Sequence, residues 1–366
     1  DTKVLTRRMP PKPVPRKKAP SRGAGPGARK PAAPRPSGAA AKIDPDTLWL
    51  MYRKMVEIRK FEEHVWDVYT RGWMPGLAHL YIGEEAVAVG ACSVLRDDDY
   101  ITSTHRGHGH CLAKGADPKY LYAEFYGRVT GCCKGKGGSM HPAFPEIGIL
   151  GTSAIVGGGI PLAVGMALAS KLRSDGRISV TFFGDGAADE GSFHESMNFA
   201  SLKKLPVIFV CENNFYAVNS PISARQPHPD IHKRAESYGM RGVEVAGDDV
   251  LSIYREAKRA AQLARDGGGP TLIECKTYRW RGHVGPECDY GKGCRPKKEL
   301  MDWMEQCPVE TFREMLLKQG IISEKWCESV LRDTDARLDN ALKFGKDSPF
   351  PEKMEVLNHV YWEKKQ

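Results

Sequence analysis

The sequence has 366 residues, a formal net charge of +9 and an apolar content of 41%. This length suffices for one large α/β domain or two smaller ones, and no apolar stretch is long enough to span a bilayer. The positive charge lies in residues 1–42, which hold twelve Lys or Arg and one acid, whereas the rest of the chain holds 42 basic and 44 acidic side chains. The basic net charge therefore does not indicate that the folded body binds nucleic acid or a membrane.

Residues 1–42 contain nine prolines and almost no large apolar side chains, a composition typical of disordered or polyproline-like segments. A transit peptide is also basic and acid-poor, but the prolines oppose an amphipathic helix and serine is scarce. A nucleic-acid arm and a tether to a larger assembly are the other functional readings. We favour a solvated or tethering tail. We thus expect a disordered basic Pro/Ala-rich tail over 1–42 and one α/β domain with C-terminal helices over 43–366.

Helical periodicity and strand-like apolar runs alternate along the rest of the chain. A helix capped by Asp46 should end near Arg71-Gly72, and small residues predict closely packed helices over 83–95 and from Ile160. Strands are expected at 100–103, 178–183, 207–211, 242–245 and 271–275, and further helices at 120–126, 193–204, from Asp249, at 309–318 and at 323–344. This alternation predicts an α/β fold with a mainly parallel sheet and helices on both faces.

Polar residues follow two neighbouring strands at the centre of the chain. The strand over 178–183 runs into Gly184-Asp185-Gly186, and the strand over 207–211 is followed by Asn213-Asn214. Because parallel strands end at one edge of the sheet, where ligands usually bind, these side chains should lie together. Carboxylate and amide oxygens suit Mg²⁺ or Ca²⁺, and we expect Gly186-Ala187 to open a helix whose N-terminus favours an anion. The sequence predicts a cation–diphosphate site.

A histidine-rich loop follows the first predicted strand. His105, His108 and His110 are interleaved with Arg106 and glycines, which is not a core composition. The histidines could bind a metal, but no carboxylate or Cys lies at a familiar ligand spacing. An anion-binding loop with Arg106 as the charge fits better, and a surface loop is the plain alternative. A second stretch, the glycine-rich loop over 131–141, lacks the P-loop pattern.

Four loops are expected to converge on one site. They carry His79, the residues 105–110, the pair Asp185 and Asn214, and the residues 279–283. Together they supply cation ligands and positive charge, and Arg and His are suited to contact phosphate oxygens.

Ten cysteines are spread along the chain. Cys132 and Cys133 are adjacent, Cys288 and Cys294 are separated by five residues, and no paired C-x-x-C motif indicates zinc. We expect free thiols in a reducing compartment.

G-D-G followed after twenty-six residues by N-N resembles the thiamine diphosphate motif. The resemblance extends to the α subunit of the E1 component of 2-oxo acid dehydrogenase complexes, acetoin dehydrogenase included. It is carried by GDGAADEGSFHESMNFASLKKLPVIFVCENNFYAV, GLAHLYIGEEAVAVG, HRGHG, KGKGGSMH, AIVGGGIPLAVG and TYRWRGH. These segments span roughly residues 44–310, and the resemblance implies the thiamine diphosphate-binding α/β fold.

The resemblance also implies roles for individual residues. Mg²⁺ would be bound by Asp185, Asn214 and the main-chain carbonyl of Tyr216, and the backbone N–H groups of Gly186 and Ala187 would contact the diphosphate. The remaining pocket residues would be His79, His105, Arg106, Ala154, Val156, Arg279 and His283.

Val156 would support the bent cofactor, although a plain core role is the alternative. His283 is the first candidate for proton transfer, because His titrates near neutral pH. His79 and His108 are further catalytic candidates.

The implied reaction is decarboxylation of a 2-oxo acid, with pyruvate preferred, or cleavage of acetoin. The acyl group would pass to a lipoyl group on an E2 partner, while the protein contributes binding, orientation and electrostatics. In this family the glutamate that activates the cofactor comes from a separate β subunit, so an α₂β₂ heterotetramer is implied. We expect a bacterial cytoplasmic protein, with an organellar matrix or stroma as the alternative.

Several residues depart from the pattern of the family. His105 stands where pyruvate-specific relatives often have Tyr, Ser153-Ala154 replaces Asn-Gly, and Asp189-Glu190 replaces Asn-Gln close to the diphosphate. These changes leave the implied cofactor site intact and both substrates open. Two alternatives remain: a thiamine diphosphate-dependent lyase or decarboxylase subunit that does not use lipoate, and a non-catalytic cofactor-binding or assembly subunit.

Overall fold

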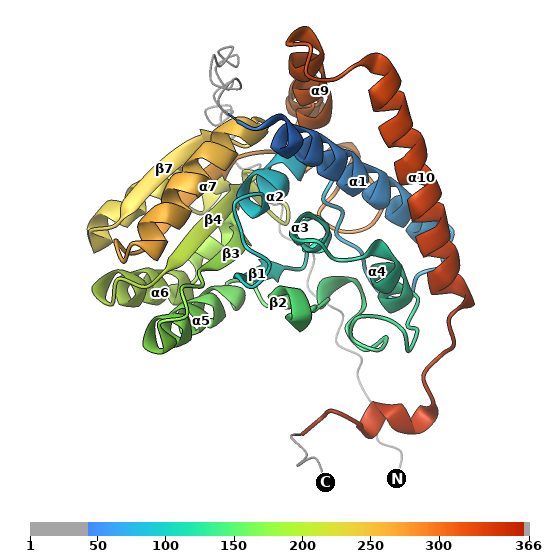
Figure 1. Cartoon of the computed structure of the whole chain (residues 1–366), viewed down its shortest axis with the longest axis horizontal. Helices are drawn as coiled ribbons and strands as arrows, with labels where there is room; N and C mark the ends of the chain where they lie inside the picture. Colours follow the sequence, from blue (N-terminus) through green and yellow to red (C-terminus); the bar gives the residue numbers. More distant parts are fainter. Residues whose placement is uncertain (1–42, 362–366) are drawn as a thin grey trace, which may run out of the picture. The chain divides into compact units, whose positions relative to one another are not determined.

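The computed structural model describes residues 43–361, so the predicted tail over 1–42 lies outside the described residues. A six-stranded sheet with the order β2-β1-β3-β4-β8-β7 forms the centre, and its strands pair in parallel (Figure 1). Its strands are β1 (Tyr100–Thr104), β2 (Ile149–Ser153), β3 (Ser179–Gly184), β4 (Val207–Asn213), β7 (Arg241–Ala246) and β8 (Thr271–Lys276). A separate antiparallel pair consists of β5 (Tyr216–Ala217) and β6 (Ser220–Pro221). The predicted α/β fold is confirmed.

Helices cover both faces of the sheet (Figure 1). The α-helices of the described chain are α1 (Pro45–Thr70), α2 (Glu85–Cys92), α3 (His108–Lys114), α4 (Pro118–Phe125), α5 (Gly159–Arg173), α6 (Gly191–Leu202), α7 (Val250–Arg265), α8 (Lys297–Met304), α9 (Pro308–Lys318) and α10 (Glu324–Asp347). The larger core lies between the sheet and α1, α2, α3 and α7, and the smaller one between the sheet and α5 and α6. Both faces are apolar, as is typical of parallel sheets.

The strand β4 shows how one sequence serves two cores. Ile208 and Val210 point into the larger core, whereas Phe209 and Cys211 point into the smaller one. Successive side chains of a strand point to opposite faces, so the side chains of this continuous apolar run are buried on both faces of the sheet. This burial fixes the position of the polar residues that follow.

The helix starts agree with the predictions in most places. At α7, Asp249 caps the helix and accepts hydrogen bonds from the N–H groups of Leu251 and Ser252, which normally stabilises a helix by about 1 kcal/mol. The cap expected at Asp46 was wrong. The helix α1 begins at Pro45, whose fixed φ suits a first turn, and Asp46 lies inside that turn.

The strand β2 and the helix α3 are two of the elements that the sequence did not predict. The strand β2 includes Gly151 and pairs with β1 across an irregular register, and the short helix α3 takes up His108 and His110, which we had placed in a loop. Neither segment has a strong local preference, because glycines interrupt both, so their structure depends on burial against the rest of the chain.

All ten cysteines lie within the described residues, and none of them forms a disulfide, as predicted. Within residues 43–361, the helices are too short or too polar to cross a membrane.

Candidate active site

The ends of β3 and β4 carry Asp185 and Asn214, the two side chains that were predicted to bind a cation. The two strands pair in parallel along their length, and Asp185 and Asn214 come directly after them. Both side chains are buried and line the same pocket.

This pocket has a volume of about 200 Å³ and contains all but one of the residues predicted for the site. Those that line it are His79, His105, Arg106, Ala154, Val156, Asp185, Gly186, Ala187, Asn214, Tyr216, Arg279 and His283. The four predicted loops therefore meet, and His108 is the residue that the structure does not bring to the pocket.

Gly186 and Ala187 lie in the five-residue 3-10 turn η4 (Asp185–Asp189), and α6 begins only at Gly191. The expected placement at the N-terminus of a helix was wrong, because this turn separates the strand from the helix. A Cβ atom on Gly186 would lie 2.8 Å from the Cβ of Ala217. The close approach of the β5–β6 hairpin to this turn therefore requires glycine at position 186.

Asp185 has a cation partner within the chain. Arg225 contacts both Asp185 and Asp189, and Gln226 donates to the Asp185 carbonyl (3.1 Å) and to the Asp189 carboxylate (2.6 Å). Burial raises the pKa of Asp185 to about 6, although the Arg225 charge opposes the shift. The negative charge added by Asp189 is thus paired with Arg225.

The turn after β4 is fixed by its own side chains. Asn213 donates to Oε1 of Glu274 (2.6 Å) and accepts from the N–H of Phe215 (3.1 Å), which has a positive φ of 70°. Asn214 donates to Oε1 of Glu84 (3.1 Å), and its amide oxygen faces the N–H of Tyr216 at 3.4 Å. The two asparagines therefore have different roles: Asn213 stabilises the turn, whereas Asn214 faces the pocket.

Glu84 is a buried carboxylate that also lines the pocket. Its Oε2 lies 3.6 Å from Nε of Arg106 and has no hydrogen-bond partner. Burial and the nearby Glu212 carboxylate raise the pKa of Glu84 above its ordinary value. Sequence reasoning missed this residue, although it lies within the GLAHLYIGEEAVAVG motif.

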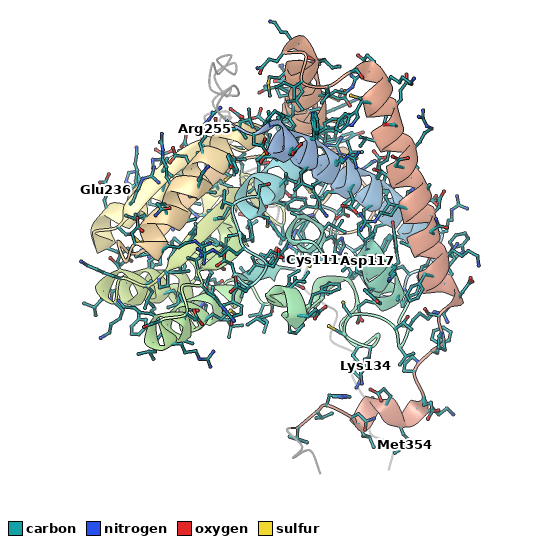
Figure 2. The ribbon with its side chains drawn as sticks, viewed as in Figure 1. Cys111, Asp117, Lys134, Glu236, Arg255 and Met354 are labelled. Carbon is teal, nitrogen blue, oxygen red and sulfur yellow. The ribbon has the colours of Figure 1, made fainter. Side chains whose placement is uncertain are left out.

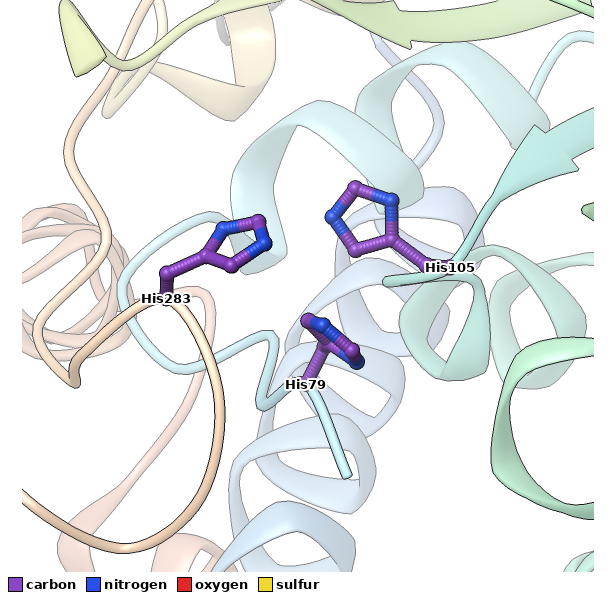
Figure 3. A group of neighbouring side chains, drawn as sticks. All are labelled: His79, His105 and His283. Carbon is purple, nitrogen blue, oxygen red and sulfur yellow. The ribbon is translucent and has the colours of Figure 1, made fainter. Parts of the chain in front are cut away.

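Three histidines from separate segments face one another in the pocket (Figure 3). The ring centroid of His79 lies 4.5 Å from that of His105 and 5.0 Å from that of His283, and the latter two are 5.2 Å apart. Burial and the Arg106 charge lower the pKa to about 2 for His79, about 3 for His105 and about 4 for His283. The imidazoles are therefore neutral at neutral pH.

One ring nitrogen from each of these histidines lies within 4.8 Å of the others, a spacing that could hold a metal ion. However, the Arg106 guanidinium that opposes protonation of the imidazoles would also oppose a divalent cation. The cluster is better suited to a neutral or anionic ligand.

Two guanidinium groups give the pocket its positive charge. Arg106 donates to the carbonyls of Leu80 (2.6 Å) and His283 (3.1 Å). Arg279 is fully buried and pairs with Asp289 at 3.1 Å, while its Nε has no partner. These contacts fix both guanidinium groups.

His108 and His110 belong to two buried networks. His108 lies between Glu62 (2.9 Å) and Oγ of Ser139 (2.9 Å), so it joins α1 to the glycine-rich loop. His110 lies between Ser103 (2.8 Å) and Glu212 (3.0 Å). Their contacts are those of residues that hold the scaffold beneath the pocket.

Comparison with known proteins identifies the family. The family described as "Dehydrogenase E1 component" matches residues 53–354. The α subunit of acetoin:2,6-dichlorophenolindophenol oxidoreductase from Bacillus subtilis is 46% identical over 314 residues, which cover 86% of this chain and 93% of that protein. Its counterpart from Cupriavidus necator is 41% identical over 88% of this chain and 96% of that protein.

A chloroplastic relative is also similar. The pyruvate dehydrogenase E1 component subunit alpha-3 of Arabidopsis thaliana is 38% identical over 85% of this chain and 73% of that protein. The family implies thiamine diphosphate as cofactor and a β subunit as partner. The chain belongs to the dehydrogenase E1 component family and is the α subunit of a thiamine diphosphate-dependent E1 enzyme.

Proposed function

We propose that this chain holds Mg²⁺ and thiamine diphosphate in the pocket at the ends of β3 and β4. The carboxylate of Asp185, the amide oxygen of Asn214 and the carbonyl of Tyr216 would bind Mg²⁺, which prefers oxygen ligands. One observation carries this proposal: Asp185 and Asn214 share their pocket with the guanidinium groups of Arg106 and Arg279. Oxygen ligands beside fixed positive charge are what a cation–diphosphate needs.

Unpaired buried atoms support a polar ligand here. Nδ1 of His79, Oε2 of Glu84 and Nε of Arg279 lack hydrogen-bond partners, and all three residues line the pocket. Because buried polar atoms are normally paired, a bound polar group would account for such atoms. The backbone N–H groups of Gly186 and Ala187 would contact the diphosphate.

The other pocket residues complete the proposed cofactor site. His105 and His283 would lie beside the diphosphate with the two arginines, and Ala154 and Val156 would support the cofactor rings. Val156 is half-exposed, so its side chain is available to a ligand, which favours this role over a plain core role.

Acetoin is the substrate that the histidine cluster fits best. When bound, thiamine diphosphate supplies a carbon nucleophile and an electron sink for cleaving a bond next to a carbonyl group. Release of acetaldehyde from acetoin requires a base to take the proton of its hydroxyl group, whereas loss of CO₂ from a 2-oxo acid needs none at that step. An imidazole of the cluster has an unprotonated nitrogen that could accept a hydrogen bond from this hydroxyl group and then its proton, with a lower basicity than an ordinary His because its pKa is lowered.

His283 is the proposed proton acceptor, and His79 and His105 contact it edge-on (Figure 3). His108, which was a further catalytic candidate, is proposed instead as a positioning residue, because its ring is held between Glu62 and Ser139. Arg106 donates to the carbonyl of His283 and so holds that loop in place.

Pyruvate is the second candidate substrate. The guanidinium groups of Arg106 and Arg279 line the pocket, and either charge suits a substrate carboxylate. The relatives described above also include both substrate types in their names.

A partner chain would complete the pocket. Its volume of about 200 Å³ is below the roughly 300–1000 Å³ of typical small-molecule sites, which supports a site shared with the β subunit. We propose an α₂β₂ heterotetramer that passes its acyl group to a lipoyl-bearing E2, in the bacterial cytoplasm or an organellar matrix or stroma. The tail over 1–42, which lies outside the described residues, is proposed as a tether.

A substrate panel tests the proposal. The α and β chains would be purified together, loaded with Mg²⁺ and thiamine diphosphate, and supplied with 2,6-dichlorophenolindophenol as electron acceptor. We expect dye reduction with acetoin, and faster reduction than with pyruvate or branched 2-oxo acids. Faster reduction with pyruvate would select the second candidate, and cofactor binding without dye reduction by any substrate would favour a non-catalytic subunit. Turnover without transfer to lipoyl-E2 would favour a lyase or decarboxylase that does not use lipoate.

A further inference from the structure

The glycine-rich loop is built around one buried carboxylate. Glu124 of α4 is fully buried and accepts at Oε2 from the N–H groups of Cys133 (2.7 Å) and Gly135 (2.9 Å). At Oε1 it accepts from Gly137 (2.7 Å) and Gly138 (3.1 Å). Hydrogen bonds to a charged acceptor are among the strong ones, so this carboxylate fixes the backbone of the loop.

The same loop forms part of the pocket wall. Met140 lines the pocket, and its carbonyl accepts from Oγ1 of Thr152 (2.8 Å). The preceding residue, Ser139, contacts Nε2 of His108 (2.9 Å), in the helix that follows the pocket residue Arg106. A change in the backbone of the loop would therefore reach the pocket.

The opposite side of the loop contacts the C-terminal segment. Lys136 donates to the carbonyl of Asn358 (2.8 Å), and Lys134 lies 3.5 Å from Glu355. Figure 2 shows Lys134 beside the segment that carries Met354. Lys134 also has a positive φ of 57°, a conformation that a residue with a side chain adopts only when its surroundings hold it.

Cys132 and Cys133 lie at the start of this loop, and both are half-buried. Their sulfur atoms and an oxygen of Glu124 lie within 4.8 Å of one another. A hydrogen bond from the Cys132 thiol lowers the pKa of Cys133 and raises that of Cys132. The thiolate is the nucleophile in thiol chemistry, and the order in which the two thiols react is decided by the single variants described below.

We propose that Cys132 and Cys133 are an oxidation site, which a hydroperoxide converts to a disulfide between adjacent residues and which thereby weakens cofactor binding. The Cys133 thiolate attacks a peroxide oxygen, and after protonation of the leaving group gives a sulfenic acid and water. The Cys132 thiol then displaces water from that sulfenic acid and forms the S–S bond. In sum, two thiols are oxidised and one hydrogen peroxide is reduced to two waters.

The product would act directly on the contact with Glu124. A disulfide between adjacent residues closes a small ring that contains the peptide bond joining them, and the nitrogen of that peptide is the Cys133 N–H that donates to Glu124. The new ring restrains this peptide. The hydrogen bond that the Cys133 thiol donates to the carbonyl of His141 (3.3 Å) is also lost, because the sulfur no longer carries a hydrogen. The loop would lose part of its fixed geometry beside the pocket.

The sequence allows a direct test. Cleavage after Arg128 and after Lys134 gives the peptide VTGCCK, which holds Cys132 and Cys133 and no other cysteine. The α and β chains would be treated together with hydrogen peroxide, digested and analysed by mass spectrometry. We expect this peptide to lose the mass of two hydrogens before Cys307, a half-buried single thiol, is oxidised. Treatment with dithiothreitol should restore the original mass of the peptide.

Two variants assign the roles of the thiols. In Cys132→Ser, Cys133 should stop at a sulfenic acid that dimedone traps. In Cys133→Ser, the remaining thiol should be unreactive under the same conditions. Equal reactivity of the two variants, or oxidation of Cys307 with no mass loss in VTGCCK, would overturn the proposal.

A second readout tests the link to the pocket. Oxidation should weaken thiamine diphosphate binding by about tenfold, the effect of losing one hydrogen bond to a charged acceptor, and the double variant Cys132→Ser/Cys133→Ser should be insensitive to peroxide. Unchanged affinity after the disulfide forms would overturn the link. This arm rests on the proposed cofactor site, whereas the mass readout does not, so the two failures are distinguishable.

Discussion

Asn214 donates a hydrogen bond from its amide nitrogen to Oε1 of Glu84 over 3.1 Å. Both side chains are buried at the pocket. Because the carboxylate oxygen accepts the amide N–H, the amide group is held with its oxygen toward the N–H of Tyr216 (3.4 Å), and the second lone pair of that oxygen can face the proposed cation. Glu84 is thereby a positioning residue for a proposed metal ligand.

Two replacements of Glu84 should show whether cofactor binding requires the hydrogen bond to Asn214 or only the negative charge of Glu84. Glu84→Ala should weaken Mg²⁺-dependent binding of thiamine diphosphate by about tenfold, because one buried hydrogen bond is lost. Glu84→Gln keeps an acceptor of the same size and should retain most of the affinity. Cofactor affinity of the α and β chains together, measured by fluorescence quenching across a Mg²⁺ titration, checks this. Equal affinities for the alanine variant and the unaltered chain would contradict the positioning role.

His283 should matter for turnover more than for binding. In His283→Gln the proposed proton acceptor is lost but the fixed guanidinium groups remain, so cofactor affinity should stay within a few-fold while turnover of acetoin falls by about 10²–10⁴-fold, the usual contribution of a general base. Steady-state kinetics with a parallel cofactor titration measures both quantities. A normal turnover rate would remove His283 from the mechanism.

The neutral histidines should make stability depend on pH. The folded-state pKa values of about 2, 3 and 4 for His79, His105 and His283 lie below the ordinary value of about 6.5. The unfolded chain therefore binds more protons below that value. The stability linked to these residues is present above about pH 6.5 and is lost as the pH falls.

His105→Gln checks this pH dependence. Thermal unfolding of the full chain between about pH 7.5 and 5.5 should show a smaller fall of the midpoint in the variant, because one group that the folded chain keeps neutral has been removed. Identical pH profiles for the variant and the unaltered chain would show that His105 makes no such contribution.

Several pocket residues could be predicted from the sequence because they follow strands whose apolar runs are easy to recognise, whereas Ala154 and Val156, which follow the unpredicted strand β2, were predicted only through the family resemblance. Asp185 and Asn214 lie at neighbouring strand ends since β3 and β4 are parallel and adjacent. The same reasoning brings in the loop that carries Arg279 and His283, which follows β8, and β8 pairs with β4.

Other residues could not be found in this way, because their role depends on packing between distant segments. Arg225 reaches Asp185 and Asp189 across the β5–β6 hairpin region, and nothing in its local sequence indicates this. His108 was the opposite case. Its place in a polar, glycine-rich segment suggested a pocket residue, whereas burial of the α3 helix against Glu62 turned it inward.

The turn after β4 predicts a stability effect that is independent of the cofactor. Glu274 is fully buried and accepts hydrogen bonds from Asn213, from the backbone and ring of His232, and from Lys276. Glu274→Ala leaves these donors without a partner and should lower the free energy of unfolding by about 3–5 kcal/mol. Urea unfolding measures it, with the exposed Glu236→Ala as control. Equal losses in the two variants would contradict the role of Glu274.

The proposed metal–diphosphate site is tested most directly by the effect of Asp185→Ala on cofactor binding. The α and β chains with this substitution should still assemble but lose Mg²⁺-dependent binding of thiamine diphosphate, because the buried carboxylate proposed to hold the cation is gone. The measurement is a cofactor titration with and without Mg²⁺, with Glu236→Ala as the matched surface control. Retained Mg²⁺-dependent binding in Asp185→Ala would contradict the assignment of the metal–diphosphate site to the ends of β3 and β4.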